Sequence, residues 1–433
     1  MTSPQIAVVG AGPAGLAAAG EARKAGARVL LIEERPSLGG RAMIVPGARG
    51  LTEGLMRELE RAEVWRNSTV WGIFGRTLAV LRGDRVATVT ADAVIFATGA
   101  REGIIPFPGW TLDGVLTVEG GWEAVRAGRI AQGFGPVIVA GRADAGGLAA
   151  RLAERGATVT LVAPERPSGV PDGVPVQPGT LRQATGNLAV ERVVLEDGTS
   201  LDCRMLCVES PRAPAIELLR LAGCPCVYQP LLGGFVPRYD PSLSLHGPTP
   251  GLYVAGCASG VDTSRAAAES GRLAASCALR ALGLLPDPEQ RVDEARQRLA
   301  AASIPLHARA REALMVGAMP DEVVEHWDGP ADTVICPCEG VTAAQLAEAL
   351  EAGARTPDEL KRRTRCGMGT CQWRRCGAPV MRWISGVLDT PIGRIALPHL
   401  RPPARPIPLA SLAGLVTSGN PPAPYPPAPV PDP

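Results

Sequence analysis

The fold is decided by residues 5–40, which read "QIAVVGAGPAGLAAAGEARKAGARVLLIEERPSLGG". A short apolar run leads into a glycine-rich turn, a helix-like stretch and a second apolar run that ends at Glu33. Gly10 allows a tight turn, Gly12 lets the backbone approach a pyrophosphate, and Gly15 lets the helix pack on the strand. Glu33 stands where a carboxylate accepts a ribose hydroxyl. The stretch therefore predicts a strand–turn–helix–strand unit that binds a dinucleotide at the helix N-terminus.

The composition excludes several classes of function. The 433 residues, 46% of them hydrophobic and 20% charged, predict a globular chain of about three domains. A net charge of +1 and an aromatic content of 4% argue against a nucleic-acid partner. The sequence has no transmembrane segment and no signal-peptide pattern, so we expect a cytoplasmic protein with reduced thiols. In that compartment eleven cysteines indicate metal or redox chemistry.

Two later stretches extend the first nucleotide unit. Residues 91–99 form an apolar strand that ends in Thr98-Gly99, and residues 251–275 form a further strand, a glycine turn and a helix of small residues. These pieces resemble the flavoproteins with two dinucleotide-binding domains, in which the first fingerprint holds FAD. The resemblance implies an α/β fold of two Rossmann-like domains, the second inserted in the first. It also implies a set of cofactor-binding residues: Gly10, Gly12, Pro13, Ala14, Gly15, Glu33, Glu34, Gly40, Arg41, Thr98, Gly99, Gly256 and Cys257.

Cys257 departs from that family pattern. The family places an aspartate here, after the glycine of the late motif, to bind the ribityl chain. A thiol is a poor hydrogen-bond acceptor and is uncharged at neutral pH. The sequence therefore favours FAD with one contact missing, and leaves open a different or weakly held nucleotide.

The second nucleotide-type unit has a degenerate fingerprint. In residues 135–167, "GPVIVAGRADAGGLAARLAERGATVTLVAPERP", the middle glycine is replaced by Ala143. Asp144 adds a negative charge where a pyrophosphate would lie, and the following strand ends in Ala163 without a carboxylate for a ribose. We expect a packing domain that no longer binds NAD(P), with a working NAD(P) site as the alternative.

Two cysteine pairs flank a helix–turn–helix near the C-terminus. The segment begins "CPCEGVT" and ends "TRCGMGTCQWRRC", and Thr356 with Glu359 predicts the N-terminus of its second helix. Four thiolates bind zinc or an iron–sulfur cluster, and a C-x-C pair suits zinc poorly.

The segment resembles the [2Fe–2S] domain of the bacterioferritin-associated ferredoxin type. The resemblance implies that the cluster ligands are Cys336, Cys338, Cys371 and Cys376. It also implies that Gly367 and Gly369 let the backbone approach the sulfides. Cys366 makes a second C-x4-C pair with Cys371, so a change of ligand stays open.

The remaining cysteines have less specific surroundings. Cys203, Cys207 and Cys277 are expected in the core, and Cys224-Pro-Cys226 lacks a partner pair. The absence of any C-x-x-C argues against a flavoprotein disulfide reductase. The four histidines are expected in surface or capping roles.

The order of the motifs divides the chain into five parts. They are an FAD domain of residues 1–112 and 247–285, a degenerate nucleotide domain of 113–246, a connector of 286–333, a cysteine domain of 334–390 and a proline-rich tail of 391–433 whose end we expect to be unpacked.

This order resembles the alpha subunits of heteromeric amine dehydrogenases, such as opine oxidases, hydrogen cyanide synthase, and proline and D-hydroxyproline dehydrogenases. The resemblance implies an electron-transfer subunit with FAD and a [2Fe–2S] cluster. It also implies an FAD-containing beta subunit that oxidises the substrate, and a quinone or a carrier protein as acceptor. No residue of this chain is expected to be catalytic. The alternatives are a stand-alone NAD(P)H-dependent reductase and a non-enzymatic iron- or cluster-handling protein.

Overall fold

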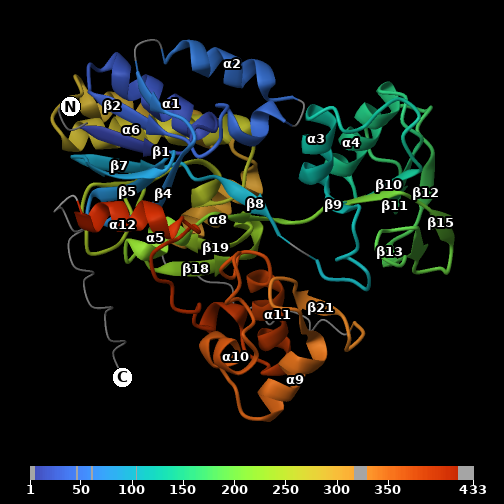
Figure 1. Cartoon of the computed structure of the whole chain (residues 1–433). Helices are drawn as coiled ribbons and strands as arrows, with labels where there is room; N and C mark the ends of the chain where they lie inside the picture. The colour runs from blue at the N-terminus through green and yellow to red at the C-terminus, as the bar shows by residue number, and fades with distance from the viewer. Residues whose placement is uncertain (1–4, 45–46, 60–61, 104, 316–328, 418–433) are drawn as a thin grey trace.

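The computed structural model describes residues 5–44, 47–59, 62–103, 105–315 and 329–417. Figure 1 shows three bodies: an N-terminal α/β domain, a second α/β domain beside it, and a small helical domain below both. The predicted α/β class, with the second Rossmann-like domain inserted in the first, is confirmed.

The first domain is built on a parallel sheet with strand order β20-β7-β1-β2-β3. The strands are β1 Ile6–Val9, β2 Val29–Ile32, β3 Glu63–Trp65, β7 Ala93–Phe96 and β20 Leu252–Val254. The helices are α1 Pro13–Lys24, α2 Arg49–Arg57 and α6 Ser264–Ala281, and an antiparallel sheet is formed by β4 Ser68–Phe74, β5 Thr77–Arg82 and β6 Arg85–Thr90. β1 pairs with β2 on one side and β7 on the other, so the strand predicted to precede the glycine turn is central.

Helices α1 and α6 approach each other unusually closely because both carry small residues where they meet. A side chain at Gly271 would place its Cβ 2.0 Å from the carbonyl oxygen of Ala14. A side chain at Gly15 would lie 1.8 Å from the carbonyl oxygen of Gly10. The glycine turn, the first helix and the late helix are thereby held as one unit.

The second domain repeats this plan with strand order β12-β11-β10-β16-β9. Its strands are β9 Val115–Thr117, β10 Val137–Ala140, β11 Val159–Ala163, β12 Val176–Pro178 and β16 Met205–Val208. Helices α3 Val118–Arg126 and α4 Ala143–Glu154 pack on it, and β13 Leu181–Thr185, β14 Arg192–Leu195 and β15 Ser200–Asp202 form a small antiparallel sheet.

Two antiparallel strands, β8 Ala100–Glu102 and β17 Arg212–Pro214, connect the domains where the chain leaves the first and returns to it. The next elements are α5 Glu217–Leu221, β18 Cys226–Gln229 and β19 Gly234–Pro237. Their buried side chains, and those of the chain up to Leu245, pack in the core of the first domain. The inserted domain thus ends near residue 210, earlier than the expected boundary at 246, because its sheet is complete with β16.

The cysteine domain has its own core. It contains β21 Val334–Cys336, β22 Val341–Thr342, α9 Ala343–Glu351, α10 Pro357–Thr364 and α11 Gly377–Val387. The N-terminus predicted at Thr356 is confirmed: Thr356 and Glu359 form a reciprocal capping box. Ile392 and Ile395 also pack in this core, so it extends beyond residue 390.

The connector and the tail are anchored on the first domain. The connector's described part forms α7 Pro288–Ala302 and α8 Pro305–Met315. In the tail, which includes α12 Leu409–Thr417, Ala404 is buried and donates its N–H to the carbonyl of Trp71 at 2.6 Å. Residues 418–433, where the unpacked end was expected, lie outside the described residues.

We predict that Gly271→Ala weakens the first domain, because the added methyl group collides with the backbone of α1. The expected loss is about 1–3 kcal/mol of unfolding free energy. Thermal unfolding should show a lower midpoint for this variant. The control is Gly54→Ala in α2, where the nearest heavy atom to the new methyl is 3.8 Å away. Equal midpoints for the two variants would contradict the close helix contact.

Candidate cofactor and metal sites

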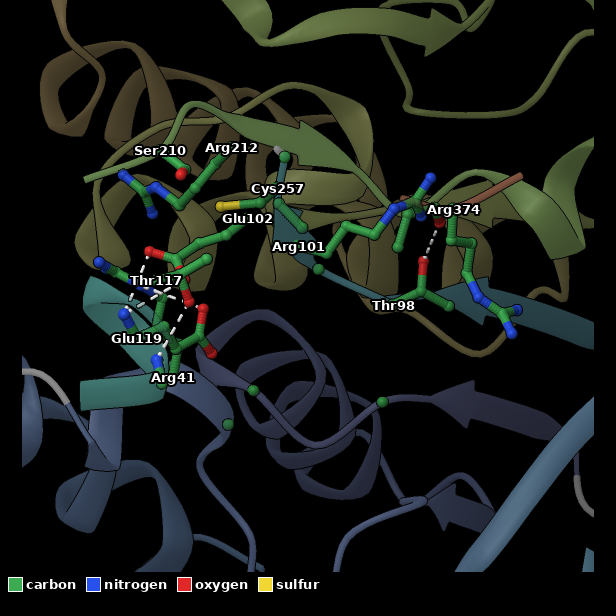
Figure 2. A pocket seen from close by; sticks show the side chains of 18 of the residues that line it. Arg41, Thr98, Arg101, Glu102, Thr117, Glu119, Ser210, Arg212, Cys257 and Arg374 are labelled. Atoms are coloured by element: carbon green, nitrogen blue, oxygen red, sulfur yellow. Dashed lines mark hydrogen bonds and ion pairs between the residues drawn. The ribbon is translucent and has the colours of Figure 1, made fainter. Parts of the chain in front are cut away.

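A cavity of about 1030 Å³ lies where the domains meet. Every candidate cofactor-binding residue except Gly15 lines it. Gly15 instead faces the carbonyl of Gly10, which is the packing role predicted for it. In Figure 2, Arg41, Glu102, Thr117 and Glu119 lie together at one side of the cavity, and Thr98, Arg101 and Arg374 at the other.

The first glycine turn leaves the N-terminus of α1 uncapped and open to the cavity. Gly10 has a φ of +100°, and a side chain there would meet the carbonyl oxygen of Ala97 at 2.3 Å. A side chain at Gly12 would meet nothing within 4 Å, so this edge of the turn is open. No side-chain hydrogen bond caps α1. Its N-terminal N–H groups therefore suit the pyrophosphate of a dinucleotide.

Glu33 is buried at the end of β2. One carboxylate oxygen accepts the N–H of Ala11 at 2.6 Å, and the other accepts the N–H of Arg35 at 2.9 Å. Burial raises the pKa of Glu33, and these hydrogen bonds oppose the shift. The carboxylate is thus fixed against the glycine turn while it lines the cavity where a ribose is expected.

Two other candidate residues have partners within the protein. Arg41 contacts Asp144 of the second domain, with 2.6 Å between Nη2 and Oδ2. Glu34 pairs with Arg405 of the tail at 3.4 Å. Sequence reasoning did not foresee either pair, because the partners are distant in the chain.

Thr98 and Cys257 line the cavity without a charge. The Thr98 hydroxyl donates to the carbonyl of Ala215 at 2.7 Å, and the Cys257 thiol donates to the carbonyl of Asp262 at 3.8 Å. Asp262 also borders the cavity, but its carboxylate is bound to Arg311 at 2.6 Å and does not replace the missing family aspartate. His307, expected in a surface or capping role, lies 3.6 Å from this same carboxylate.

Glu102, at the end of β8, lines the cofactor cavity where the two domains meet. Burial raises the pKa of its carboxyl group, which accepts a hydrogen bond from the N–H of Glu119 at 3.1 Å and one from Thr117. These contacts join β8 to the start of α3 and shape the side of the cavity nearest Arg41 (Figure 2).

The second glycine turn is occupied by the chain itself. One oxygen of Glu209 accepts the N–H groups of Arg142 at 2.7 Å and of Ala145 at 2.9 Å. These amides stand at the N-terminus of α4, where a pyrophosphate would bind. A side chain at Gly141 would lie 2.3 Å from the Cβ of Glu209, so the carboxylate fills this space.

The cysteines of the helical domain converge. The Sγ atoms of Cys336, Cys366 and Cys376 all lie within 4.8 Å of one another. Burial raises the pKa of Cys371, and the neighbouring thiol of Cys338 adds to the shift. The converging thiols therefore include two of the four candidate ligands, Cys336 and Cys376, with Cys366 as the third, while Cys338 and Cys371 neighbour each other.

This thiol group favours a bound cation. Hydrogen bonds from Cys366 and Cys376 lower the pKa of Cys336 to about 2, and contact with Cys336 raises the pKa of both Cys366 and Cys376. The N–H of Gly367 also points at the sulfur of Cys336 at 3.4 Å. One thiolate therefore forms readily within this group, as a metal ligand must. Elsewhere, burial raises the pKa of Cys224 and of Cys226 to about 12, so that pair stays protonated. Cys203, Cys207 and Cys277 are buried, as predicted.

Trp373 is a feature of the cysteine loop that sequence reasoning missed. Its ring fills the spaces left by two glycines, since side chains at Gly367 and Gly377 would lie 2.2 Å and 2.4 Å from ring atoms. Gln372 and Trp373 both have left-handed φ values, 50° and 72°. The loop between Cys371 and Cys376 is thus held in a strained conformation, as functional loops often are.

The cofactor cavity reaches the cysteine site. Cys371 and Pro337 line the same cavity as the first glycine turn. The indole N–H of Trp110, on the cavity wall, donates to the carbonyl of Val334 at 2.7 Å. The open first turn fits FAD and the thiols fit an iron–sulfur cluster, so the two candidate sites adjoin within one chain.

Comparisons with known proteins agree with this geometry. Residues 4–167 match the pyridine nucleotide-disulphide oxidoreductase family, and residues 334–385 match the BFD-like [2Fe-2S] binding domain. The fold also resembles the crystal structure of L-proline dehydrogenase from P. horikoshii, with a TM-score of 0.75 and 24% identity over 95% of this chain and 79% of that one. Fold and sites together define a flavoprotein oxidoreductase that binds FAD and carries a fused [2Fe–2S] domain.

Two relatives show to which family of flavoprotein oxidoreductases the chain belongs. The opine oxidase A subunit of Rhizobium meliloti is 30% identical over 95% of this chain and 87% of its own length. The HcnB subunit of hydrogen cyanide synthase from Pseudomonas aeruginosa is 29% identical over 95% of this chain and 98% of its own. The chain belongs to the family of opine oxidase A subunits. No described helix is long and apolar enough to cross a membrane.

We predict that Cys338→Ser removes the iron–sulfur centre, because a serine hydroxyl does not ionise at neutral pH as a thiol ligand must. Iron content and the long-wavelength visible absorption should fall together. The matched control is Cys224→Ser, which alters a buried protonated thiol outside the site and should keep the iron. Full iron content in Cys338→Ser would contradict the ligand assignment.

Proposed function

We propose that this chain is the electron-transfer subunit of a heteromeric amino acid or amine dehydrogenase of the opine, proline or hydroxyproline type. A partner beta subunit with its own FAD oxidises the C–N bond of the substrate. The present chain passes the electrons to a quinone or a carrier protein. When bound, FAD accepts electrons in pairs and the [2Fe–2S] cluster releases them singly.

The observation that carries this proposal is the shared cavity. The glycine turn, Glu33 and Thr98 of the first domain line it, and so does Cys371 of the cysteine domain. Arg374 of the cysteine domain also lines the cavity. It donates a hydrogen bond at 2.5 Å to the carbonyl of Ala404, which packs on the first domain, and so links the two domains beside the cavity. The chain thus holds its two cofactor sites side by side without an intervening domain.

The roles of the residues follow from this geometry. The N-terminal amides of α1 bind the pyrophosphate, and Glu33 orients the ribose. Cys336, Cys338, Cys371 and Cys376 hold the cluster, with Cys366 as a neighbouring thiol. Several charged residues of the cavity are engaged in ion pairs, such as Arg101 with Glu217 and Arg41 with Asp144. We therefore assign substrate oxidation to the partner and no catalytic residue to this chain.

The relatives support a partner, since both are named as subunits. The eleven thiols, all free of disulfides in the structure, favour the cytoplasm.

The alternative of a stand-alone NAD(P)H-dependent reductase is disfavoured by Glu209. A dinucleotide would have to displace this carboxylate from the amides of Arg142 and Ala145. Asp144 in the first turn of α4 adds a second negative charge, which is engaged by Arg41. Repulsion between like charges opposes pyrophosphate at both positions.

We predict that NADH does not bleach the flavin of the purified holo-chain under anaerobic conditions. Glu209→Ala should free the two amides and raise the affinity for NADH by about tenfold or more, as expected when a charge-assisted hydrogen bond no longer competes. Glu209→Gln is the matched control, because it keeps an oxygen acceptor on those amides. Rapid bleaching of the unmodified chain by NADH would instead establish a reductase.

The proposal as a whole is tested by adding an amino acid substrate, such as proline, hydroxyproline or an opine, under anaerobic conditions. The holo-chain alone should keep its flavin and cluster oxidised with every substrate. In the purified complex with its beta subunit, one substrate should reduce both chromophores of this chain. If a substrate reduced the isolated chain, substrate oxidation would not belong to the beta subunit alone, and the proposal would be wrong.

A further inference from the structure

A second cavity, of about 1160 Å³, lies between the cysteine domain and the first domain. On one side it is bordered by β17, β18 and β19, and on the other by α10, α11 and the chain from residue 397 to 406. Figure 1 shows β18 and β19 facing the cysteine domain across this region. We call this cavity the basic groove.

The groove carries a strong local excess of positive charge. Nine arginine and lysine side chains line it against two carboxylates, whereas the whole chain has a net charge of only +1. The cationic side chains are Arg101, Arg212, Arg220, Lys361, Arg362, Arg374, Arg375, Arg382 and Arg401. Both carboxylates are already engaged, Glu217 by Arg101 and Asp358 by His399.

Four of these arginines are available to a partner. Arg362, Arg375, Arg382 and Arg401 are exposed, and none of them forms an ion pair with another described residue. Like charges gathered on one face repel each other, so this arrangement is unfavourable without an anionic partner.

The groove lies directly against the metal site. Its lining includes the cysteine loop from Gly367 to Thr370, together with Gln372 and Trp373. The N–H of Gly367 points at the sulfur of Cys336, and a side chain at Gly369 would lie 2.3 Å from the Cβ of Cys338. Met368, on the same loop, is 37% exposed. A protein bound in the groove therefore touches the loop that encloses the thiols.

We propose that the basic groove docks an acidic one-electron carrier protein, which takes electrons from the cluster. This inference rests on the proposed function and names the acceptor. In each encounter one electron leaves the reduced cluster and reduces the oxidised carrier, and no proton moves. Arginine forks match the carboxylates of an acidic surface. An uncharged quinone ring would leave the same arginines without partners, so we favour the protein carrier.

The test compares two high-potential one-electron carriers of opposite charge, an acidic plastocyanin and a basic mitochondrial-type cytochrome c. Calorimetry measures the Kd of each oxidised carrier for the holo-chain at low and at physiological salt. Stopped-flow mixing of the photochemically reduced holo-chain then measures the electron-transfer rate. We expect the acidic carrier to react about tenfold faster or more at low salt, with both its rate and its affinity falling as salt rises.

The variant that tests the site is the triple charge reversal Arg362→Glu, Arg382→Glu and Arg401→Glu. It should weaken plastocyanin binding by about tenfold or more and invert the preference for the two carriers. The matched control is Arg85→Glu, an exposed arginine of β6 that does not line the groove. Iron content and the visible spectrum report whether each variant keeps its cluster.

Three failures are distinguishable. If the cluster is reduced but both carriers react alike and binding is insensitive to salt, the groove is not a carrier site and the relay function stands. If the reversals release the beta subunit from the complex, the groove is a subunit interface and the carrier proposal is wrong. If no cluster is reduced through the flavin at all, the proposed function itself is overturned.

Discussion

The close approach of backbone to backbone at the first glycine turn is the constraint on which the structure depends. Gly10 meets the carbonyl of Ala97, Gly15 that of Gly10, and Gly271 that of Ala14, each at a distance that leaves no room for a side chain. These contacts bring β7, the turn, α1 and α6 together. They leave the N-terminus of α1 without a side-chain cap beside a cavity that residues of the cysteine domain also line.

The two glycine turns have the same fold, but only the first leaves room for a dinucleotide. At the first, the helix amides are free and a buried glutamate stands beside them, so a dinucleotide fits. At the second, the carboxylate of Glu209 takes the amides, and Asp144 is turned toward Arg41 of the first domain. Residues of the second domain thereby line the cofactor cavity instead of a second nucleotide site. Its Rossmann topology is kept because the sheet still packs, although the anion site is filled from within.

Much of this arrangement could be predicted from the sequence, because the deciding signals are local. The glycine spacing around Gly12 and the capping box of Thr356 involve residues a few positions apart. Glu209 could not be predicted, since it reaches its partner amides across 67 and 64 positions. The same holds for Arg405, which lies 371 positions from Glu34. The place of Cys366 among the thiols also depends on how the loop folds around Trp373, which spacing alone does not specify.

We propose that a flavin and a [2Fe–2S] cluster share this chain and exchange electrons. Anaerobic stepwise reduction of the holo-chain, followed by visible absorption and electron paramagnetic resonance, tests it most directly. We expect an uptake of about three electrons per chain, two by the flavin and one by the cluster, with a paramagnetic iron–sulfur signal at the end point. An uptake of about two electrons without any iron–sulfur signal would contradict it.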